Sequence, residues 1–376
     1  MRSLTSSRKW WRWCRWLGAA SLFLMGCAAG FTLWIDPYQV YHPVRGGHPR
    51  FNRYLQRYFV PGLARHGDYQ IALAGTSMLE NIANSSVERL CGAPAVNLCM
   101  NGASIHEETL ALRLVLQHPG TTTAILTMDY NSLSGGATDP VVGSNNVFPA
   151  YLYDDSILDK FPYLLSFDSL WTAYRLRYRP ALPEETLNAD FPWKFPDTAV
   201  FSASTAVKGI DPANINRSFG LPNLKLELLQ SAFAANMFPL LANNKSVRIH
   251  FVFPPYSILV WHDFAQRSQI ATYFAFKKWL IEQSERFGNF DVVDYQDRAG
   301  IITNLSLYAD IYHYNEEILE RVVRSACVGD ARLTRDNFDA RTESLLHLVN
   351  STNPADIVRQ ALGDGAKSVA APAARP

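Results

Sequence analysis

The sequence predicts an α/β protein in which a parallel five-stranded sheet carries helices on both faces, preceded by one N-terminal transmembrane helix. Two observations lead to this fold class. Short apolar segments that end in small or polar residues alternate with longer segments of helical periodicity, which is typical of a buried parallel sheet covered by helices. Near the N-terminus, residues 17–35 form an uncharged run of nineteen residues. A helix of that length nearly spans a bilayer core of about 30 Å.

The composition is that of a folded protein with a sizeable core. Apolar residues make up 48% of the 376 residues and charged residues 18%, which excludes wholesale disorder. The net charge of +1 gives no indication of a nucleic-acid partner. No Cys/His spacing suggests a metal site, so we expect neither a metal nor an organic cofactor.

The charges near the N-terminus predict how the chain is oriented in a membrane. Residues 1–16 contain five cations and four tryptophans, and the first acidic residue is Asp36. By the positive-inside rule this flank is cytoplasmic, 17–35 is a single-pass inner-membrane anchor, and the rest is periplasmic. Two other fates stay open: lipidation of Cys27 in a lipobox-like sequence, or cleavage after Ala28 and Ala29. We favour an uncleaved anchor because the apolar run continues to Ile35.

After residue 35, the periodicity divides the chain into three parts, the second of which contains an insertion. Residues 36–68 read as a juxtamembrane segment with an amphipathic helix over 51–65, and 69–329 as the α/β domain. Its strands are expected at 69–74, 95–100, 123–128, 247–253 and 290–295. Its helices are expected at 78–90, 104–117, 224–242, 261–287 and 315–326. Residues 132–222 lose this periodicity and form an insertion, which is either a lid or substrate-binding segment or merely decorative. Residues 330–376 are expected to contain a C-terminal helix and a disordered tail from Gly363.

Three cysteines fall in the predicted periplasmic part, namely Cys91, Cys99 and Cys327. That compartment permits disulfides, but an odd number leaves at least one cysteine unpaired within the chain. We expect isolated buried cysteines.

Polar or glycine-containing turns follow the first four strands. Ser77 comes after the first strand, Gly102 after the second, Asn131 after the third and Tyr256 after the fourth. Ligands of open parallel sheets bind beyond the carboxyl ends of the strands, so these residues are candidates for one site. A serine between a strand and a helix is well placed as a nucleophile, because backbone N–H groups there can receive an oxyanion.

A base for this serine stands late in the chain. His313 follows Asp310 by three residues and precedes a predicted helix. In so short a turn the Asp310 carboxylate can orient the imidazole through Nδ1, which leaves Nε2 to face Ser77. By contrast, we expect Asp129 to satisfy a turn and Glu80 to be an exposed helical residue.

These motifs together resemble the SGNH (GDSL-type) hydrolases. Gly75-Thr76-Ser77 is similar to their Gly-Asp-Ser block, with threonine in place of aspartate, and Asn101-Gly102 to their second block. Asp310-Ile-Tyr-His313 matches the closing Asp-x-x-His. In the third block the family has Gly-x-Asn-Asp, where this chain has Met128-Asp-Tyr-Asn131. The resemblance covers about residues 69–325, apart from the insertion, and implies a flavodoxin-like sheet.

The resemblance also implies an activity. Gly-Thr-Ser-Met-Leu-Glu-Asn81 and Phe253-Pro-Pro-Tyr-Ser257 are similar to membrane-anchored proteins encoded with capsule and exopolysaccharide genes, and more distantly to DltD and the alginate O-acetylation proteins. We therefore expect a serine-dependent acyl-ester hydrolase or O-acyltransferase acting on a cell-envelope polysaccharide. Its catalytic residues are Ser77, Asp310 and His313. Gly102, Asn131 and Tyr256 are expected to bind the oxyanion or the substrate.

Two other hypotheses stay open. The departures from the family at Thr76 and in the third block are compatible with an inactive scaffold or binding subunit of a polysaccharide-export complex. A phosphate-handling enzyme is the weakest alternative, because no Walker pattern or carboxylate cluster is visible. For the transferase, a membrane-bound acyl-donor protein is the expected partner.

Overall fold

The structure is a computed structural model that describes residues 4–45, 48–135, 148–156, 158–196, 198–215 and 223–369. The chain divides into two compact units. Unit 1 comprises Met1–His66 and Pro149–Ala189, and unit 2 comprises Gly67–Phe148 and Asp190–Pro376. The predicted insertion therefore does not form one body. Its residues 149–189 belong to the unit that contains the N-terminal helix, while residues 136–147 and 216–222 lie outside the described residues.

Unit 2 is built on a mostly parallel sheet of six strands in the order β3-β2-β4-β6-β7-β8. The strands are β2 Ile71–Ala74, β3 Ala95–Asn97, β4 Thr123–Thr127, β6 Arg248–Phe253, β7 Phe290–Asp294 and β8 Arg332–Leu333. The first five are parallel and coincide with the five predicted strands, so the α/β class is confirmed. The sixth strand, β8, pairs with β7 in the antiparallel sense. β8 was not predicted, because a strand of two residues carries no periodicity.

The helices of unit 2 alternate with these strands. They are η2 Ser77–Leu79, α3 Asn84–Cys91, α4 Ile105–Gln117, α5 Tyr130–Leu133, α8 Ala203–Ala206, η4 Pro212–Asn214, α9 Leu226–Asn243, α10 Ile258–Gln266, α11 Ile270–Phe287, α12 Ala299–Ile302, η5 Leu305–Leu307, α13 Glu316–Val328, α14 Arg335–Ser351 and α15 Pro354–Val369. The capping box of Ser104 and Glu107 opens α4 as predicted. The predicted helix over 261–287 is instead two helices, α10 and α11, because Ser268 adopts a left-handed conformation with φ of 58° between them.

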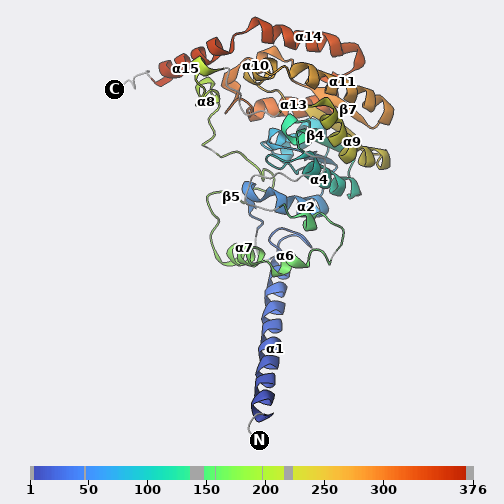
Figure 1. Ribbon diagram of the computed structural model, residues 1–376, viewed down its shortest axis with the longest axis vertical. Helices are drawn as coiled ribbons and strands as arrows, with labels where there is room; N and C mark the ends of the chain where they lie inside the picture. The colour runs from blue at the N-terminus through green and yellow to red at the C-terminus, as the bar shows by residue number, and fades with distance from the viewer. Residues whose placement is uncertain are drawn as a thin grey trace. The chain divides into compact units, whose positions relative to one another are not determined.

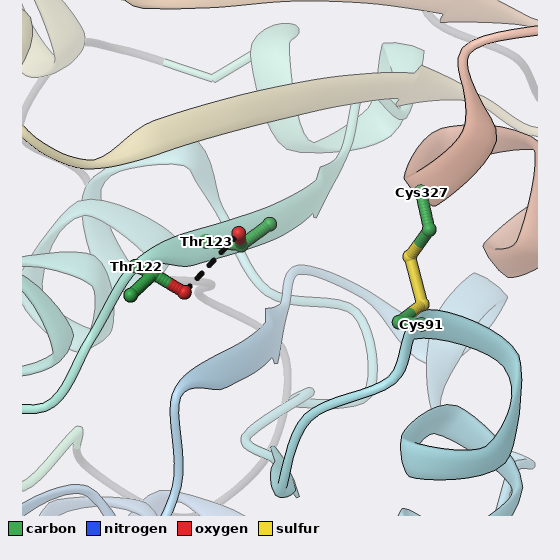
Figure 2. The surroundings of a disulfide bond; sticks show 4 residues. All are labelled: Cys91, Thr122, Thr123 and Cys327. Carbon is green, nitrogen blue, oxygen red and sulfur yellow. Dashed lines mark hydrogen bonds between the residues drawn. A yellow bond between two sulfur atoms is a disulfide. The ribbon is translucent and has the colours of Figure 1, made fainter.

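A disulfide joins two of these helices. Cys91 ends α3 and Cys327 lies in α13, and their Cα atoms are 5.4 Å apart (Figure 2). The expectation of isolated cysteines was wrong for this pair, because the packing of α3 against α13 brings together residues 236 positions apart. Cys99 is buried and unpaired, as expected.

The C-terminal region is helical for longer than predicted. α14 packs against α10 and α11, and α15 against α8 and α10. α15 continues through Gly363, where we expected the tail to begin, as far as Val369. Residues 370–376 lie outside the described part of the chain.

Unit 1 contains α1 Leu4–Ile35, β1 Phe51–Asn52, η1 Arg53–Leu55, α2 Gln56–His66, η3 Ala150–Leu152, α6 Phe161–Leu165, α7 Phe167–Tyr178 and β5 Glu185–Thr186. α1 is a single unbroken helix, long and apolar enough to cross a membrane (Figure 1). It ends where Asp36 turns to a φ of 49°. The buried Asp36 carboxylate accepts the backbone N–H groups of Val40, Tyr41 and His42 and the hydroxyl of Tyr163.

Candidate active site

The turn after β2 presents Ser77. Gly75 has a φ of +120°, which side-chain-bearing residues rarely adopt. An added Cβ there would lie 2.1 Å from Thr127 Oγ1, so only glycine fits against β4. The same Thr127 oxygen accepts the N–H of Thr76 at 2.9 Å. Ser77 then begins the three-residue helix η2 rather than the long helix that we expected, and its side chain is half-buried.

A short hairpin carries the other two residues. Tyr308 and Tyr314 form an antiparallel bridge, and Ala309 N–H donates to the His313 carbonyl at 2.8 Å. The Tyr314 hydroxyl donates to the Met78 carbonyl at 2.6 Å, which fixes the hairpin directly to the residue after Ser77.

Ser77, His313 and Asp310 form one hydrogen-bonded chain. Ser77 Oγ lies 2.8 Å from His313 Nε2, and His313 Nδ1 lies 2.7 Å from Asp310 Oδ2. The other Asp310 oxygen accepts the N–H groups of Tyr312 and His313, both at 2.8 Å. The three-residue spacing thus lets one carboxylate hold both the ring and the backbone of the histidine.

The pair adjusts the acidity of both partners. Burial disfavours the imidazolium, but the hydrogen bond and charge of Asp310 outweigh it and raise the pKa of His313. Burial alone would raise the pKa of Asp310, but the hydrogen bonds from His313 and Tyr312 lower it. Half of the Asp310 side-chain surface is exposed, so solvent screens part of this interaction.

A second carboxylate, Asp129, lies next to Thr76, the residue before Ser77. It receives the Tyr256 hydroxyl at 2.9 Å, the Asn131 N–H at 3.1 Å and the Thr76 hydroxyl at 3.2 Å. The N–H bond caps α5 as expected of a turn residue, but the bond from Thr76 was not foreseen. Burial raises the pKa of Asp129. Burial and the Asp129 charge raise the pKa of the neighbouring Glu108 well above its ordinary value.

The three predicted binding residues have different environments. Gly102 is exposed, with a φ of +59°, two residues after Met100, whose N–H donates to the Gly75 carbonyl at 2.8 Å. The segment that leads to Gly102 therefore runs beside the turn that carries Ser77. Asn131 is exposed at the start of α5, and within the described residues no hydrogen bond joins it to Ser77 or His313. Tyr256 is only 1% exposed and holds Asp129, so it lies behind the triad and presents no surface to a substrate.

Phe195 was not predicted as a site residue, and Glu80 was wrongly expected to be exposed. Phe195 meets the His313 ring edge-on at 5.7 Å, and its N–H donates to the Asn81 side chain at 2.8 Å. Trp193 is buried and its indole donates to the Asn97 carbonyl at 2.8 Å, which anchors this segment. The only signal was the aromatic sequence Phe-Pro-Trp-Lys-Phe. Glu80 is fully buried, because the chain bends after η2 and does not continue as a helix.

The pocket at the triad is small. Ser77, His313, Phe195 and Asn81 line it, and its volume is about 10 Å³, about the space that one water molecule needs. A larger cavity of about 300 Å³ lies elsewhere, between Arg298 and the α13 residues Arg321 and Arg324. We place the candidate site at the triad, because among the described residues only there do a serine, a histidine and an orienting carboxylate form one hydrogen-bonded chain.

Comparison with known proteins adds no family to this geometry. No protein-family model matches the sequence, and no curated protein matches it significantly. The residues and their contacts therefore carry the functional assignment by themselves.

Proposed function

We propose that this chain is a membrane-anchored, SGNH-like acyl-ester hydrolase or O-acyltransferase that acts on an extracytoplasmic polysaccharide. The observation that carries the proposal is the hydrogen-bonded chain from Ser77 through His313 to Asp310. Numbered along the chain, the five parallel strands have the order 2-1-3-4-5, which is that of flavodoxin-like sheets and supports the family resemblance.

The geometry supports a two-step acyl transfer. Ser77 Oγ attacks the ester carbonyl while His313 Nε2 takes its proton, and Asp310 stabilises the imidazolium. The carbonyl oxygen becomes an oxyanion, which the N–H groups of Ser77 and Gly102 receive. The C–O ester bond then breaks, and His313 returns the proton to the leaving alkoxide. In the second step, water or a sugar hydroxyl attacks the acyl-serine with His313 as base, which regenerates Ser77.

The surroundings of the triad support a small acyl group. A pocket of about 10 Å³ next to Ser77 does not accommodate a long acyl chain without movement of Phe195. A short acyl group, such as acetyl, on a large polymer fits an open and shallow site better. The polymer would then lie along the exposed surface on which Gly102 and Asn131 stand.

The anchoring is part of the proposal. The first half of α1 is rich in cations and tryptophans and its second half is apolar, which favours a cytoplasmic N-terminus and a periplasmic unit 2. The disulfide between Cys91 and Cys327 supports the same placement, because the periplasm is oxidising.

A fluorophosphonate probe tests the activity, since it reacts covalently with an activated serine. The full chain in detergent micelles should be labelled, and Ser77→Ala should lose the label entirely. Ser231→Ala is the matched control, because Ser231 is an exposed helical serine of the same unit whose hydroxyl donates to the Leu228 carbonyl. Absence of labelling in the wild-type chain, or equal labelling in Ser77→Ala, would contradict the proposal.

The scaffold hypothesis receives less support. A nucleophile and base beyond hydrogen-bond reach would have favoured it, whereas Ser77 Oγ and His313 Nε2 are 2.8 Å apart. It would regain favour if Ser77→Ala left polymer acylation in cells unchanged at equal protein abundance.

A further inference from the structure

One face of α7, in unit 1, is an exposed aromatic stripe. Phe167, Trp171, Tyr174 and Tyr178 follow one another at intervals of four, three and four residues, which places them on the same side of the helix. Phe167 is 75% exposed, Trp171 49% and Tyr178 58%. The rings of Trp171 and Tyr174 stack on each other with their centroids 5.5 Å apart, so both lie along this face of α7. A contiguous apolar surface of this kind marks a contact with a partner or a membrane.

The stripe is not needed for the fold of unit 1. The opposite face of α7 carries Ala173 and Leu176, which are buried in a cluster with Ile35 of α1. Phe31 and Val44 complete this cluster. α7 therefore uses one apolar face to pack against the last turn of α1, while Phe167 and Trp171 on its aromatic face stay exposed.

The contact with α1 shows at which depth along the membrane-spanning helix the aromatic stripe lies. The Tyr178 ring lies parallel to the ring of Phe31 of α1, with centroids 6.5 Å apart. Phe31 is about one helical turn from the end of α1 at Ile35. In a helix that crosses a bilayer over 17–35, this last turn reaches the headgroup region, and α7 is at the same level.

Arginines flank the stripe. The Arg177 guanidinium lies 5.3 Å from the Tyr178 ring, and that of Arg179 lies 5.9 Å from the Tyr174 ring. α6 adds Phe161, which is 55% exposed. Tryptophan, tyrosine and arginine are the residues that prefer the membrane–water interface, because each joins an apolar body to a polar end.

We propose that the aromatic face of α7, together with Phe161, lies in the headgroup region of the bilayer that α1 crosses. The occupant of this surface is thus lipid, with phosphate groups beside Arg177 and Arg179. The inference rests on the proposed anchoring by α1 and goes beyond it, because a single-pass anchor alone would leave α7 in water.

Spin-label accessibility in the full chain tests this inference. Cys14 and Cys27 are replaced by alanine, and single cysteines carrying a nitroxide are introduced by Phe167→Cys, Trp171→Cys, Tyr54→Cys or Leu22→Cys. The protein is reconstituted into vesicles of phosphatidylcholine and phosphatidylglycerol. Collision with oxygen, which concentrates in lipid, is compared with collision with a water-soluble nickel chelate. Tyr54 is the matched control, because it is an aromatic residue of unit 1 that is 71% exposed. It lies in η1, between β1, which pairs with β5, and α2, and Figure 1 shows β5 and α2 farther from α1 than α7 is.

The expected result is an oxygen-to-nickel ratio several-fold higher at Phe167 and Trp171 than at Tyr54. Oxygen-to-nickel ratios at Phe167 and Trp171 equal to that at Tyr54, with a higher, lipid-like ratio at Leu22, would overturn this inference and leave the anchor intact. A water-like ratio at Leu22 would overturn the anchor as well. Labels at Phe167 and Trp171 that are shielded from both reagents would show that a protein covers the stripe, which also overturns the inference.

Discussion

Gly75→Ala is the substitution whose effect follows most directly from the structure. The new Cβ would lie 2.1 Å from Thr127 Oγ1 and 2.9 Å from Thr127 N. Thr127 N belongs to the rigid strand β4, so the turn must move instead. The φ of +120° adds strain, since alanine there costs about 1–3 kcal/mol. Loss of the hydrogen bond from Thr76 N–H to Thr127 Oγ1 costs about 1 kcal/mol more.

These contributions lower the free energy of unfolding by about 3 kcal/mol. For a domain of this size we expect the melting temperature of unit 2 to fall by about 6–12 °C. The turn also carries Ser77 away from His313, and a displacement of about 1 Å can slow catalysis by about 100-fold. We therefore expect fluorophosphonate labelling of Gly75→Ala to be slower by about that factor.

Gly102→Ala is the control. Gly102 also has a positive φ, of +59°, but a Cβ there meets nothing within 4 Å. Its cost is about 1 kcal/mol of backbone strain, without a clash. Thermal unfolding followed by circular dichroism compares the two variants. Equal melting temperatures of Gly75→Ala and Gly102→Ala would refute the claim that Thr127 leaves no space for a side chain at position 75.

Three further predictions concern the same unit. In the proposed mechanism neutral His313 is the base, and Asp310 raises its pKa, so the rate of fluorophosphonate labelling should rise with pH through a value above about 6.5. Asp310→Asn should shift this rise to lower pH, and an unshifted pH profile would count against the pairing of Asp310 with His313. Asn at position 129 can still accept the hydrogen bonds from Tyr256 and Asn131, but it places an amide NH₂ group where Thr76 now finds an acceptor. We therefore expect labelling of Asp129→Asn to be about tenfold slower, with a melting temperature within a few degrees of wild type. An unchanged labelling rate would exclude a positioning role for Asp129. Reduction of Cys91–Cys327 opens a loop of 236 residues and should cost up to about 5 kcal/mol of stability; the variant with both cysteines replaced by serine should not respond to reductant.

The His313–Asp310 pair also makes stability depend on pH, with opposite signs for its members. The raised pKa of His313 stabilises the fold below about pH 6.5, and this contribution is lost as the pH rises through the folded-state value. The lowered pKa of Asp310 stabilises the fold above about pH 4, and this is lost as the pH falls through its folded-state value. Both contributions are therefore complete only between these limits.

The sequence was sufficient for features that depend on local pattern. The five parallel strands are short apolar runs, and Asp310 holds His313 across a turn of three residues, so both could be read from neighbouring residues. The break at Ser268 was missed because the apolar periodicity runs through it. β8 was missed because its two residues depend on pairing with β7.

Features that depend on distant segments could not be predicted. Asp129 meets Thr76 across 53 positions and Tyr256 across 127, because β2, β4 and β6 are neighbours only in the folded sheet. Phe195 reaches His313 only after the chain has passed through unit 1. Asp129 has no local signal that distinguishes it from an ordinary turn residue, and the aromatic sequence around Phe195 does not indicate that it meets His313.

The disulfide connects the proposed compartment with the proposed chemistry. α3 follows the turn that carries Ser77, and α13 follows the hairpin that carries His313, so the bond between Cys91 and Cys327 links the elements next to both residues. Such a link persists only in an oxidising compartment. The cations at the N-terminal end of the chain independently favour that compartment for unit 2. If the chain were instead retained in the cytoplasm, the bond would be reduced and the Ser77–His313 distance would lose one of its constraints. We therefore expect the active conformation to be most stable in the oxidising compartment, which is also where the proposed polysaccharide substrate would lie.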